Sequence, residues 1–195
     1  LFSTPDLSIS TLANRKDAMN APSLRLIGLV LAALFGGSAQ AAIYTVGGDA
    51  ACTHGTIQSA INAANSSGTT SLIRVSRSLT YTAAALTINT PRELTIEGGY
   101  ADCTQATPDA THTLLSGAGA HAPVLTITAP TGGLIHLRNL DIKNGSVDGA
   151  GQGGGIRFSG NGILELQNST VSNNIAGYGG GIYATGTGTS TELVI

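Results

Sequence analysis

Residues 153–183 contain the same glycine-rich tetrapeptide twice, and this repeat restricts the possible folds more than any other feature of the sequence. Gly-Gly-Gly-Ile occupies residues 153–156 and again residues 179–182, a spacing of 26 residues. Short apolar runs, separated by Gly and Asn, lie between the two copies. A fixed period of about 20 to 50 residues is typical of architectures in which each repeat stacks on the next. We therefore predict that residues 153–183 form one full turn of a parallel β-helix.

The strands within this repeat follow a different spacing from the glycines. Residues 137–144 align with residues 166–173 at an offset of 29, so that Ile142 meets Val171. The difference comes from a loop, because residues 145–152 number eight and residues 174–178 number five. A solenoid tolerates insertions at one corner, since the stacked strands remain unchanged. The corner at residues 145–152 is therefore where we expect function to lie.

Four asparagines lie at the ends of the short strands. They are Asn139, Asn144, Asn168 and Asn173, and the 29-residue offset relates the first two to the last two. Asn and Gly adopt the left-handed backbone conformation of tight corners more readily than other residues. Stacked asparagines can also hydrogen-bond to one another along a stack. We interpret all four as structural corner residues, in preference to a role in ligand binding.

One segment after residue 42 has the period of an amphipathic helix. Its apolar residues recur at positions i, i+3, i+4 and i+7, namely Ile57, Ala60, Ile61 and Ala64. Thr56 is the expected N-cap, and Asn65, followed by Ser-Ser-Gly, is the expected stop. A solenoid needs a cover over its first turn. We therefore predict an N-terminal capping helix.

The remaining elements are expected to be short strands. Residues 43–46 form a first β-type run. From Leu72 onward we expect strands at Ile73 and Val75, at Leu79 and Tyr81, at Leu86 and Ile88, and at residues 93–97, 113–115, 124–128 and 134–137. The strand at residues 93–97 is expected to end at Gly98-Gly99. Residues 100–111 lack an apolar rhythm and contain Pro108, so we predict a projecting loop there, held by Cys103.

The first 41 residues indicate export. Met19, the only methionine, precedes an apolar run at residues 26–35, and Ala39-Gln40-Ala41 has the small residues of a cleavage site. We predict a signal peptide at residues 19–41, cut between Ala41 and Ala42, in preference to a buried core helix. Residues 1–18 are then over-called upstream sequence. Residues 42–195 are expected to be the N-terminal part of a β-helix domain, truncated within a strand at its C-terminal end.

The composition of residues 42–195 excludes some classes of partner. Nine acidic residues face six basic ones, so we expect no nucleic-acid binding. No apolar stretch is long enough for a transmembrane helix. The two cysteines, Cys52 and Cys103, are expected to form a disulfide in an oxidising compartment, with two separate buried thiols as the alternative. No metal site is expected, because no further ligand stands at the required spacing.

Three segments resemble known families of exported proteins. Residues 56–64 resemble the capping helix of pectin-lyase-like right-handed parallel β-helix proteins. Residues 98–104, with residues 114–117, resemble the GGY-x-x-x-C-T segment of secreted bacterial β-helix proteins. Residues 168–174, running to residues 179–183, are similar to the polymorphic outer membrane protein repeat, with Gly181 in place of its Ala and Val171 in place of its Phe. The resemblance implies an all-β, right-handed parallel β-helix solenoid at the cell exterior or outer membrane surface.

Candidates for catalysis are few. Arg138, Asp141 and Lys143, with Asp148 in the following loop, are weak candidates for a polysaccharide lyase site, where calcium is a possible cofactor. Their alternative interpretation, which we favour, is a solvated, salt-bridged sheet face. Asp141 and Glu165 form a carboxyl pair that no glycosidase motif supports. The four histidines look scattered, and we expect each to pair with nothing.

These patterns favour a role in contact over a role in catalysis. We expect a secreted or outer-membrane-associated, bacterial-type β-helix surface protein with a structural, adhesive or autotransporter-passenger role. The alternative is a polysaccharide lyase or glycoside hydrolase acting on extracellular polysaccharide. Expected partners are extracellular polysaccharide or components of a host or other surface. No cofactor is expected outside the lyase alternative.

Overall fold

The computed structural model describes residues 40–82, 84–186 and 192–195. The predicted upstream segment (1–18) and the predicted signal peptide up to residue 39 lie outside these residues. Ala41 is exposed, and Ala42, directly after the predicted cleavage point, begins the first strand. No helix within the described residues is long and apolar enough to cross a membrane.

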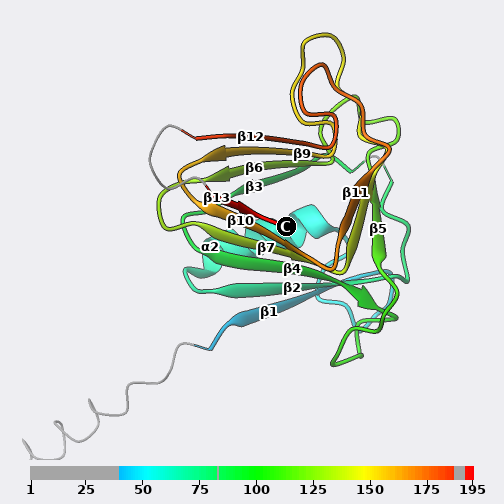
Figure 1. The fold of residues 1–195 in the computed structure, drawn as a ribbon. Coiled ribbons are helices and arrows are strands. Elements are labelled where there is room, and N and C mark those ends of the chain that lie inside the picture. The colour runs from blue at the N-terminus through cyan, green and yellow to red at the C-terminus, as the bar shows by residue number, and fades with distance from the viewer. Residues whose placement is uncertain (1–39, 83, 187–191) are drawn as a thin grey trace, which may run out of the picture. The chain divides into compact units, whose positions relative to one another are not determined.

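The described chain consists of short parallel strands and one helix, which agrees with the all-β prediction (Figure 1). The strands form a six-stranded sheet in the order β1-β2-β4-β7-β10-β13, a three-stranded sheet β11-β8-β5 and a four-stranded sheet β12-β9-β6-β3. The bounds of the elements are β1 (Ala42–Val46), α2 (Ile57–Ser67), β2 (Ser71–Ser76), β3 (Leu86–Asn89), β4 (Glu93–Tyr100), β5 (Thr113–Ser116), β6 (Leu125–Ala129), β7 (Leu134–Arg138), β8 (Leu140–Lys143), β9 (Ile156–Gly160), β10 (Ile163–Gln167), β11 (Thr170–Ser172), β12 (Ile182–Thr185) and β13 (Glu192–Val194).

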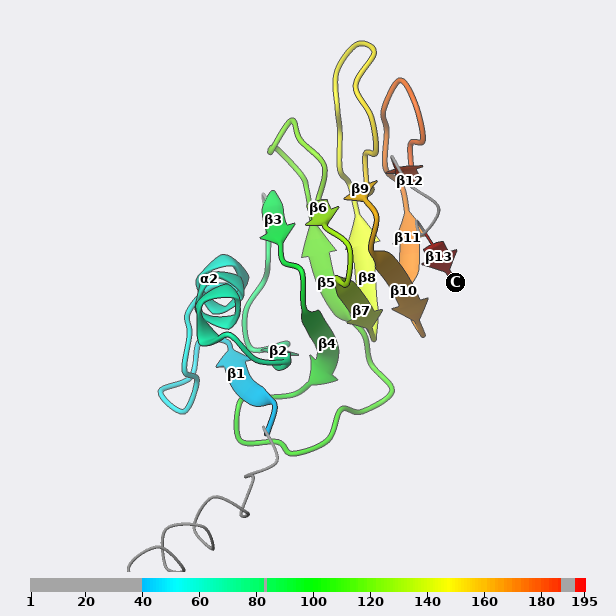
Figure 2. The same ribbon diagram turned by 90° about the vertical axis from the view of Figure 1, so that its left-hand side faces the viewer.

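From β4 onward the chain visits the three sheets in a fixed order. Each passage through the sheets, here called a pass, adds one strand to the six-stranded, then the three-stranded, then the four-stranded sheet. The passes are therefore β4-β5-β6, β7-β8-β9 and β10-β11-β12. Figure 2 shows the strands of each sheet following one another in this sequence, away from α2.

Both offsets expected from the sequence are present in the strand register. Leu137 pairs with Leu166 and Ile142 with Val171, which is the offset of 29. Ile156 pairs with Ile182, which is the offset of 26. Because side chains alternate between the two faces of a strand, equivalent residues of successive passes fall into rows. One such row, Ile73-Ile96-Leu137-Leu166, runs through the buried core.

The predicted helix is present as α2, two residues longer at its end than expected. The Thr56 hydroxyl accepts a hydrogen bond from the Ser59 backbone N–H at 3.2 Å, and Gly68 ends the helix in the left-handed conformation (φ 76°). Its apolar face is buried against β1, β2 and β3. The Gln58 side chain also pairs with the edge of β3, donating to Thr87 O (3.1 Å) and accepting from Thr87 N (2.8 Å). The helix therefore satisfies part of a strand edge as well as covering apolar surface.

The structure corrects two strand predictions. Leu79 and Tyr81 do not form a strand: Tyr81 makes one isolated bridge to Leu115, and Leu79 is exposed. The strand expected to end at Gly98-Gly99 continues through both glycines to Tyr100. A Cβ on Gly98 would lie 2.5 Å from Asn139 O of the next pass. Gly98 therefore allows a close backbone approach inside the strand and does not terminate it.

All four corner asparagines have positive φ angles, between 47° and 59°. The Asn168 amide donates to Asn139 Oδ1 at 2.7 Å, which is a hydrogen bond between stacked corners. The second pair is joined through the backbone, where Asn144 N donates to Asn173 O (3.2 Å). The Asn144 amide bonds instead to Ser116 Oγ of the preceding pass at 3.2 Å.

The predicted disulfide is present between Cys52 and Cys103. It joins the segment before α2 to the loop that follows β4, as expected from the sequence. The same loop is held by an ion pair between Arg77 and Asp109. In the chain-entropy description, closing a loop of this length removes about 4 kcal/mol of freedom from the unfolded chain.

Candidate functional site

The structure separates the four residues proposed as weak catalytic candidates. Arg138 ends β7 in the six-stranded sheet, whereas Asp141 and Lys143 lie on β8 in the three-stranded sheet. Asp148 lies in the loop after β8 with 81% of its side chain exposed. Of the four, Asp141 and Lys143 are in contact, at 3.0 Å. Glu165 lies on β10 in the six-stranded sheet and so does not share a sheet with Asp141.

Asp141 is held in a small network of hydrogen bonds. Its carboxylate accepts from Lys143 Nζ at 3.0 Å and lies 3.1 Å from His112 Nδ1. Partial burial raises the pKa of Asp141, but the hydrogen bonds from Lys143, His112 and Thr170 outweigh it and leave the pKa below its ordinary value. Asp141 is thus an ionised, paired carboxylate, which suits the salt-bridged sheet face better than a general acid.

The expectation that the histidines pair with nothing is wrong. His112 contacts Asp141, His121 contacts Asp148 at 3.4 Å, and His136 contacts Glu165 at 2.5 Å. The carboxylates of these contacts lie on the pass after the histidine, and His112 and Asp141 are 29 residues apart. The strand offset applied to His112 and His136 would have found the pairs at Asp141 and Glu165. Distance along the chain hides them, because the register decides which residues are neighbours.

His54, the fourth histidine, also has neighbours. Its Nδ1 lies 2.9 Å from the Thr53 hydroxyl, and its ring meets the edge of Tyr44 with centroids 5.4 Å apart. Both contacts lie near the start of the described chain, next to the segment that carries Cys52. They are local packing contacts and bring no carboxylate to this histidine.

A charged row crosses the six-stranded sheet. Arg74, Glu97 and Arg138 are in register on β2, β4 and β7. The Tyr100 hydroxyl donates to Glu97 Oε2 at 2.5 Å, and the Arg74 guanidinium lies 5.6 Å from the centre of the Tyr100 ring. Burial, together with the bond to Glu97, raises the pKa of Tyr100 above its ordinary value, so this hydroxyl stays a donor. Sequence reasoning did not single out this row.

Hollows open on the described surface beside α2 and beside β9. A hollow of about 370 Å³ lies between the start of α2 and residues 79–82 and 84–86, with mostly small and apolar lining. Its one ionisable group is Tyr81, whose pKa burial raises to about 12 and whose hydroxyl donates to Ser76 O at 2.9 Å. A second hollow, of about 280 Å³, lies beside β9 and is lined by Pro123, Val147, Ala150, Gly151, Gln152 and Arg157. Neither hollow gathers a pair of acid and base groups.

Three loops project together from one corner. These corner loops are residues 117–124, 145–153 and 174–180, and both views show the last two extending side by side beyond the sheets (Figures 1 and 2). Backbone hydrogen bonds connect them: Val147 N donates to Ile175 O (2.9 Å) and Tyr178 N to Gly151 O (3.0 Å). The first corner loop is connected as well, because Val124 N donates a hydrogen bond to Gly154 O at 3.2 Å. The corner is therefore an ordered surface, built by the same pairing as the strands.

The corner loops expose apolar side chains. Ile175 is 69% exposed and Tyr178 is 60% exposed, more than any other large apolar residues among those described apart from Ile195. His121 and Asp148, on the two preceding loops, lie 3.4 Å apart with exposed side chains. Large side chains held outward on an ordered backbone are suited to contact with a partner.

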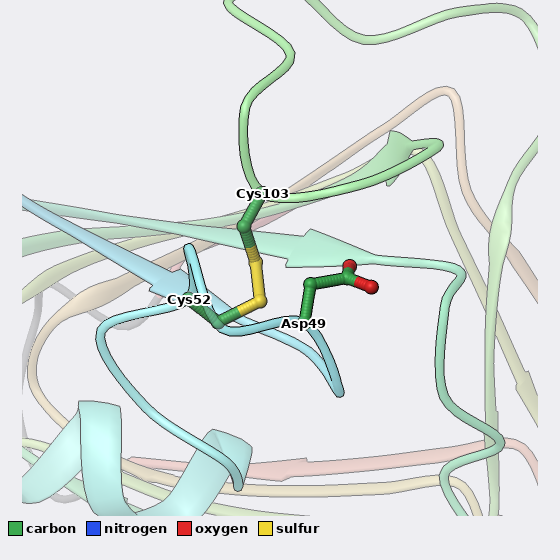
Figure 3. A group of neighbouring side chains, drawn as sticks. All are labelled: Asp49, Cys52 and Cys103. Carbon is green, nitrogen blue, oxygen red and sulfur yellow. A yellow bond between two sulfur atoms is a disulfide. The ribbon is translucent and has the colours of Figure 1, made fainter.

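One group of three metal-ligating residues occurs within the described chain, namely Asp49, Cys52 and Cys103 (Figure 3). Both sulfur atoms belong to the disulfide. A disulfide offers no thiolate, which is the form that binds metals. The single remaining carboxylate of Asp49 does not make a metal site.

No protein-family model, no curated protein and no solved structure matches this chain. The resemblances to pectin-lyase-like proteins and to polymorphic outer membrane protein repeats therefore rest on the sequence motifs alone. The parallel sheets are compatible with a β-helix.

Proposed function

We propose that residues 42–195 belong to a right-handed, pectin-lyase-like parallel β-helix that acts as an adhesive surface protein. The fixed order in which the chain visits the three sheets supports the helical path. The recurrence of the 29-residue offset at β7/β10, β8/β11 and β10/β13 supports a repeating turn. The asparagine corners support the same reading, because left-handed Asn139 and Asn168 turn β7 into β8 and β10 into β11.

Export supports a role outside the cell. The apolar run at residues 26–35 and the Ala39-Gln40-Ala41 sequence have the pattern of a signal peptide. The disulfide between Cys52 and Cys103 fits an oxidising compartment. We infer cleavage between Ala41 and Ala42, and a location at the outer membrane surface or in the medium.

The corner loops carry the adhesive role. Their backbones are fixed by hydrogen bonds between passes, so a partner meets a preformed surface and orders little on binding. Ile175 and Tyr178 provide the apolar contact area, and Tyr is a side chain that contributes strongly at interfaces. The acid and base groups are spread over two sheets and one loop, which favours contact over turnover. The partner classes proposed are extracellular polysaccharide and surface components of other cells.

An adhesion assay tests this proposal. The full chain is exported from a bacterial host, and its binding to immobilised polysaccharides and to cell surfaces is measured for the wild type and for Ile175→Ser/Tyr178→Ser. We expect the double variant to bind about tenfold more weakly, which corresponds to about 1.4 kcal/mol. Ile43→Ser is the matched control, because Ile43 is an exposed apolar residue on β1. Equal binding by wild type and double variant contradicts the corner surface, and cleavage of a polysaccharide supports the enzymatic alternative.

A further inference from the structure

Asn-Gly or Asp-Gly occurs at three places in the sequence, namely Asn144-Gly145, Asp148-Gly149 and Asn161-Gly162. At such a dipeptide the backbone nitrogen of the glycine can attack the side-chain carbonyl carbon of the residue before it, because glycine has no Cβ to obstruct the approach. A succinimide ring results, and water reopens it. The attack needs a glycine N–H outside any hydrogen bond and a side chain that can turn towards it. The surroundings of each dipeptide therefore decide which of them reacts.

The Asn144-Gly145 site is fixed on both sides of the bond that would form. Gly145 N donates to Asn174 Oδ1 at 2.8 Å, and the Asn144 amide donates to Ser116 Oγ at 3.2 Å. A Cβ on Gly145 would lie 1.9 Å from Gly154 O, so the backbone there is tightly enclosed. Both hydrogen bonds would have to break before the ring could close. This site is therefore expected to be inert in the folded protein.

The Asn161-Gly162 site is fixed through its backbone. Gly162 N donates to Ala129 O of the preceding pass at 2.8 Å. A Cβ on Gly162 would lie 2.5 Å from Gly133 O, so the backbone of other segments surrounds this glycine as well. Because the attacking nitrogen is already held in a hydrogen bond, this second Asn-Gly site is expected to be inert too.

The Asp148-Gly149 site has neither kind of restraint. The Asp148 side chain is 81% exposed and lies 3.4 Å from Nδ1 of His121, which is itself exposed. A Cβ on Gly149 would have no atom within 4 Å beyond its chain neighbours. Among residues 40–82, 84–186 and 192–195, none accepts a hydrogen bond from Gly149 N. The turn is closed instead by Gly151 N, which donates to Asp148 O at 3.2 Å.

We propose that Asp148 is a site of spontaneous backbone modification, at which aspartate converts to isoaspartate in the folded protein. Gly149 N attacks Cγ of Asp148, and the N–Cγ bond forms. The C–O bond to the carboxyl hydroxyl breaks, and this hydroxyl leaves as water together with the proton of the nitrogen. Water then adds to one of the two carbonyl carbons of the ring. Addition at Cγ restores aspartate, whereas addition at the backbone carbonyl carbon leaves the chain connected through Cγ, which is isoaspartate.

Isoaspartate lengthens the main chain by one methylene group at the tip of this corner loop. The loop is tied to the next corner loop on both sides of Asp148, by Val147 N to Ile175 O (2.9 Å) and by Tyr178 N to Gly151 O (3.0 Å). The extra carbon changes the spacing between these two connections on one loop and not on the other. The modification therefore loosens the pairing of the loops. Its effect on contact with a partner rests on the proposed adhesive role, whereas the reaction does not.

Ageing of the full chain tests which dipeptide reacts. The protein is exported from a bacterial host, kept folded at neutral pH and body temperature for several weeks, and analysed by peptide mapping with enzymatic methylation of isoaspartate. We expect isoaspartate at residue 148 in the wild type. Asp148→Glu is expected to abolish it, because glutamate would have to close a larger and less favourable ring. A wild type without isoaspartate at this position, or an Asp148→Glu protein with the same signal, overturns the proposal.

Asp148→Asn makes the chemistry of the three sites identical, so that only their surroundings differ. A hydrogen bond that must break first slows ring closure about tenfold. The asparagine introduced at residue 148 is therefore expected to deamidate at least about tenfold faster than Asn144 and Asn161 in the folded protein. In guanidinium chloride the three rates are expected to become similar. Deamidation of Asn144 or Asn161 at the rate of residue 148 in the folded protein overturns the proposal.

Hydrogen exchange tests the effect on the loops. The isoaspartate form is separated from the unmodified protein by ion exchange, and exchange of the Tyr178 amide is compared between the two. We expect faster exchange in the isoaspartate form, and equal exchange overturns the loosening of the pair. Isoaspartate at residue 148 in a protein that binds no surface rejects the adhesive role and leaves the modification established, so the two proposals fail separately.

Discussion

The two glycine triplets have the same sequence and different surroundings. A Cβ on Gly154 would lie 2.6 Å from Gly180 O and 2.6 Å from Ile175 O, and one on Gly155 would lie 2.6 Å from Gly181 O. At Gly180 the nearest atom would be Asn174 O at 3.1 Å. At Gly181 it would be a methyl of Val171 at 3.7 Å. The contacts that forbid a side chain at Gly154 and Gly155 all come from the pass that follows them.

Glycine is therefore required at this corner for two different reasons. Gly153 and Gly179, the first residue of each triplet, have positive φ angles of 68° and 59°, and each would meet the backbone of its own turn. Their glycine is required by local geometry. Gly154 and Gly155 are required by a neighbour instead, because the backbone of the next pass occupies the volume of a Cβ. The motif thus needs glycine both for local backbone geometry and for contact with the next pass. Only the local reason can be recognised from the residues of a single turn.

The largest expected effect is a difference between the triplets at their second and third positions. Gly155→Ala is expected to destabilise the protein by about 2 to 4 kcal/mol, because the backbone of the next pass at Gly181 O must move. Gly181→Ala is the matched control and is expected to change stability by no more than about 0.5 kcal/mol. Urea unfolding of both variants gives the two free energies. Equal losses would show that the neighbouring pass does not set the requirement.

A smaller effect is expected at the first position of each triplet, and it should be the same in both triplets. Gly153→Ala and Gly179→Ala both place a Cβ on a left-handed residue, which costs about 1 to 2 kcal/mol. Because the strain is local, the two losses should agree within about 0.5 kcal/mol. Urea unfolding again measures them. A much larger loss at Gly153 would mean that the neighbouring pass acts on this residue too.

The smallest effect concerns Asp141, whose hydrogen-bond partners Lys143, His112 and Thr170 lie on its own, the preceding and the following pass. Its pKa lies below the ordinary value of 3.8, so its contribution to stability is present above that value and is lost as the pH falls through the pKa of the folded state. Lys143→Met removes the largest of the three hydrogen-bond contributions, so it should raise the pKa of Asp141 more than His112→Gln does. NMR titration of the Asp141 carboxyl measures both shifts. The reverse order would make the partner from the preceding pass the dominant one.

Local patterns predicted the elements whose cause is local. The helix follows from the spacing of Ile57, Ala60 and Ile61 and from the hydroxyl of Thr56, all of which act within one turn. The corner asparagines follow from backbone strain at a single residue. The offset of 29 could be read because it repeats, and a repeat is visible in the chain without any coordinates. In the same way, two cysteines predicted one disulfide because no other pairing was available within the sequence.

The candidate site could not be predicted in the same way. Arg138 and Asp141 are three residues apart, yet Asn139, with a φ of 54°, turns the chain between them and places them on different sheets. His136 and Glu165 are far apart in the chain and in contact in the fold. Gly98 was predicted to end a strand, because the atom that requires a glycine there, Asn139 O, belongs to another pass and cannot be found from the local sequence.

The sequence by itself determined the period, the corners, the covering helix and the disulfide, because each depends on residue type and spacing along one segment. The tertiary structure alone decided which residues face one another between passes, because the register and the one-residue corners fix those neighbours. The contacts of His112 with Asp141 and of His136 with Glu165 belong to this second class.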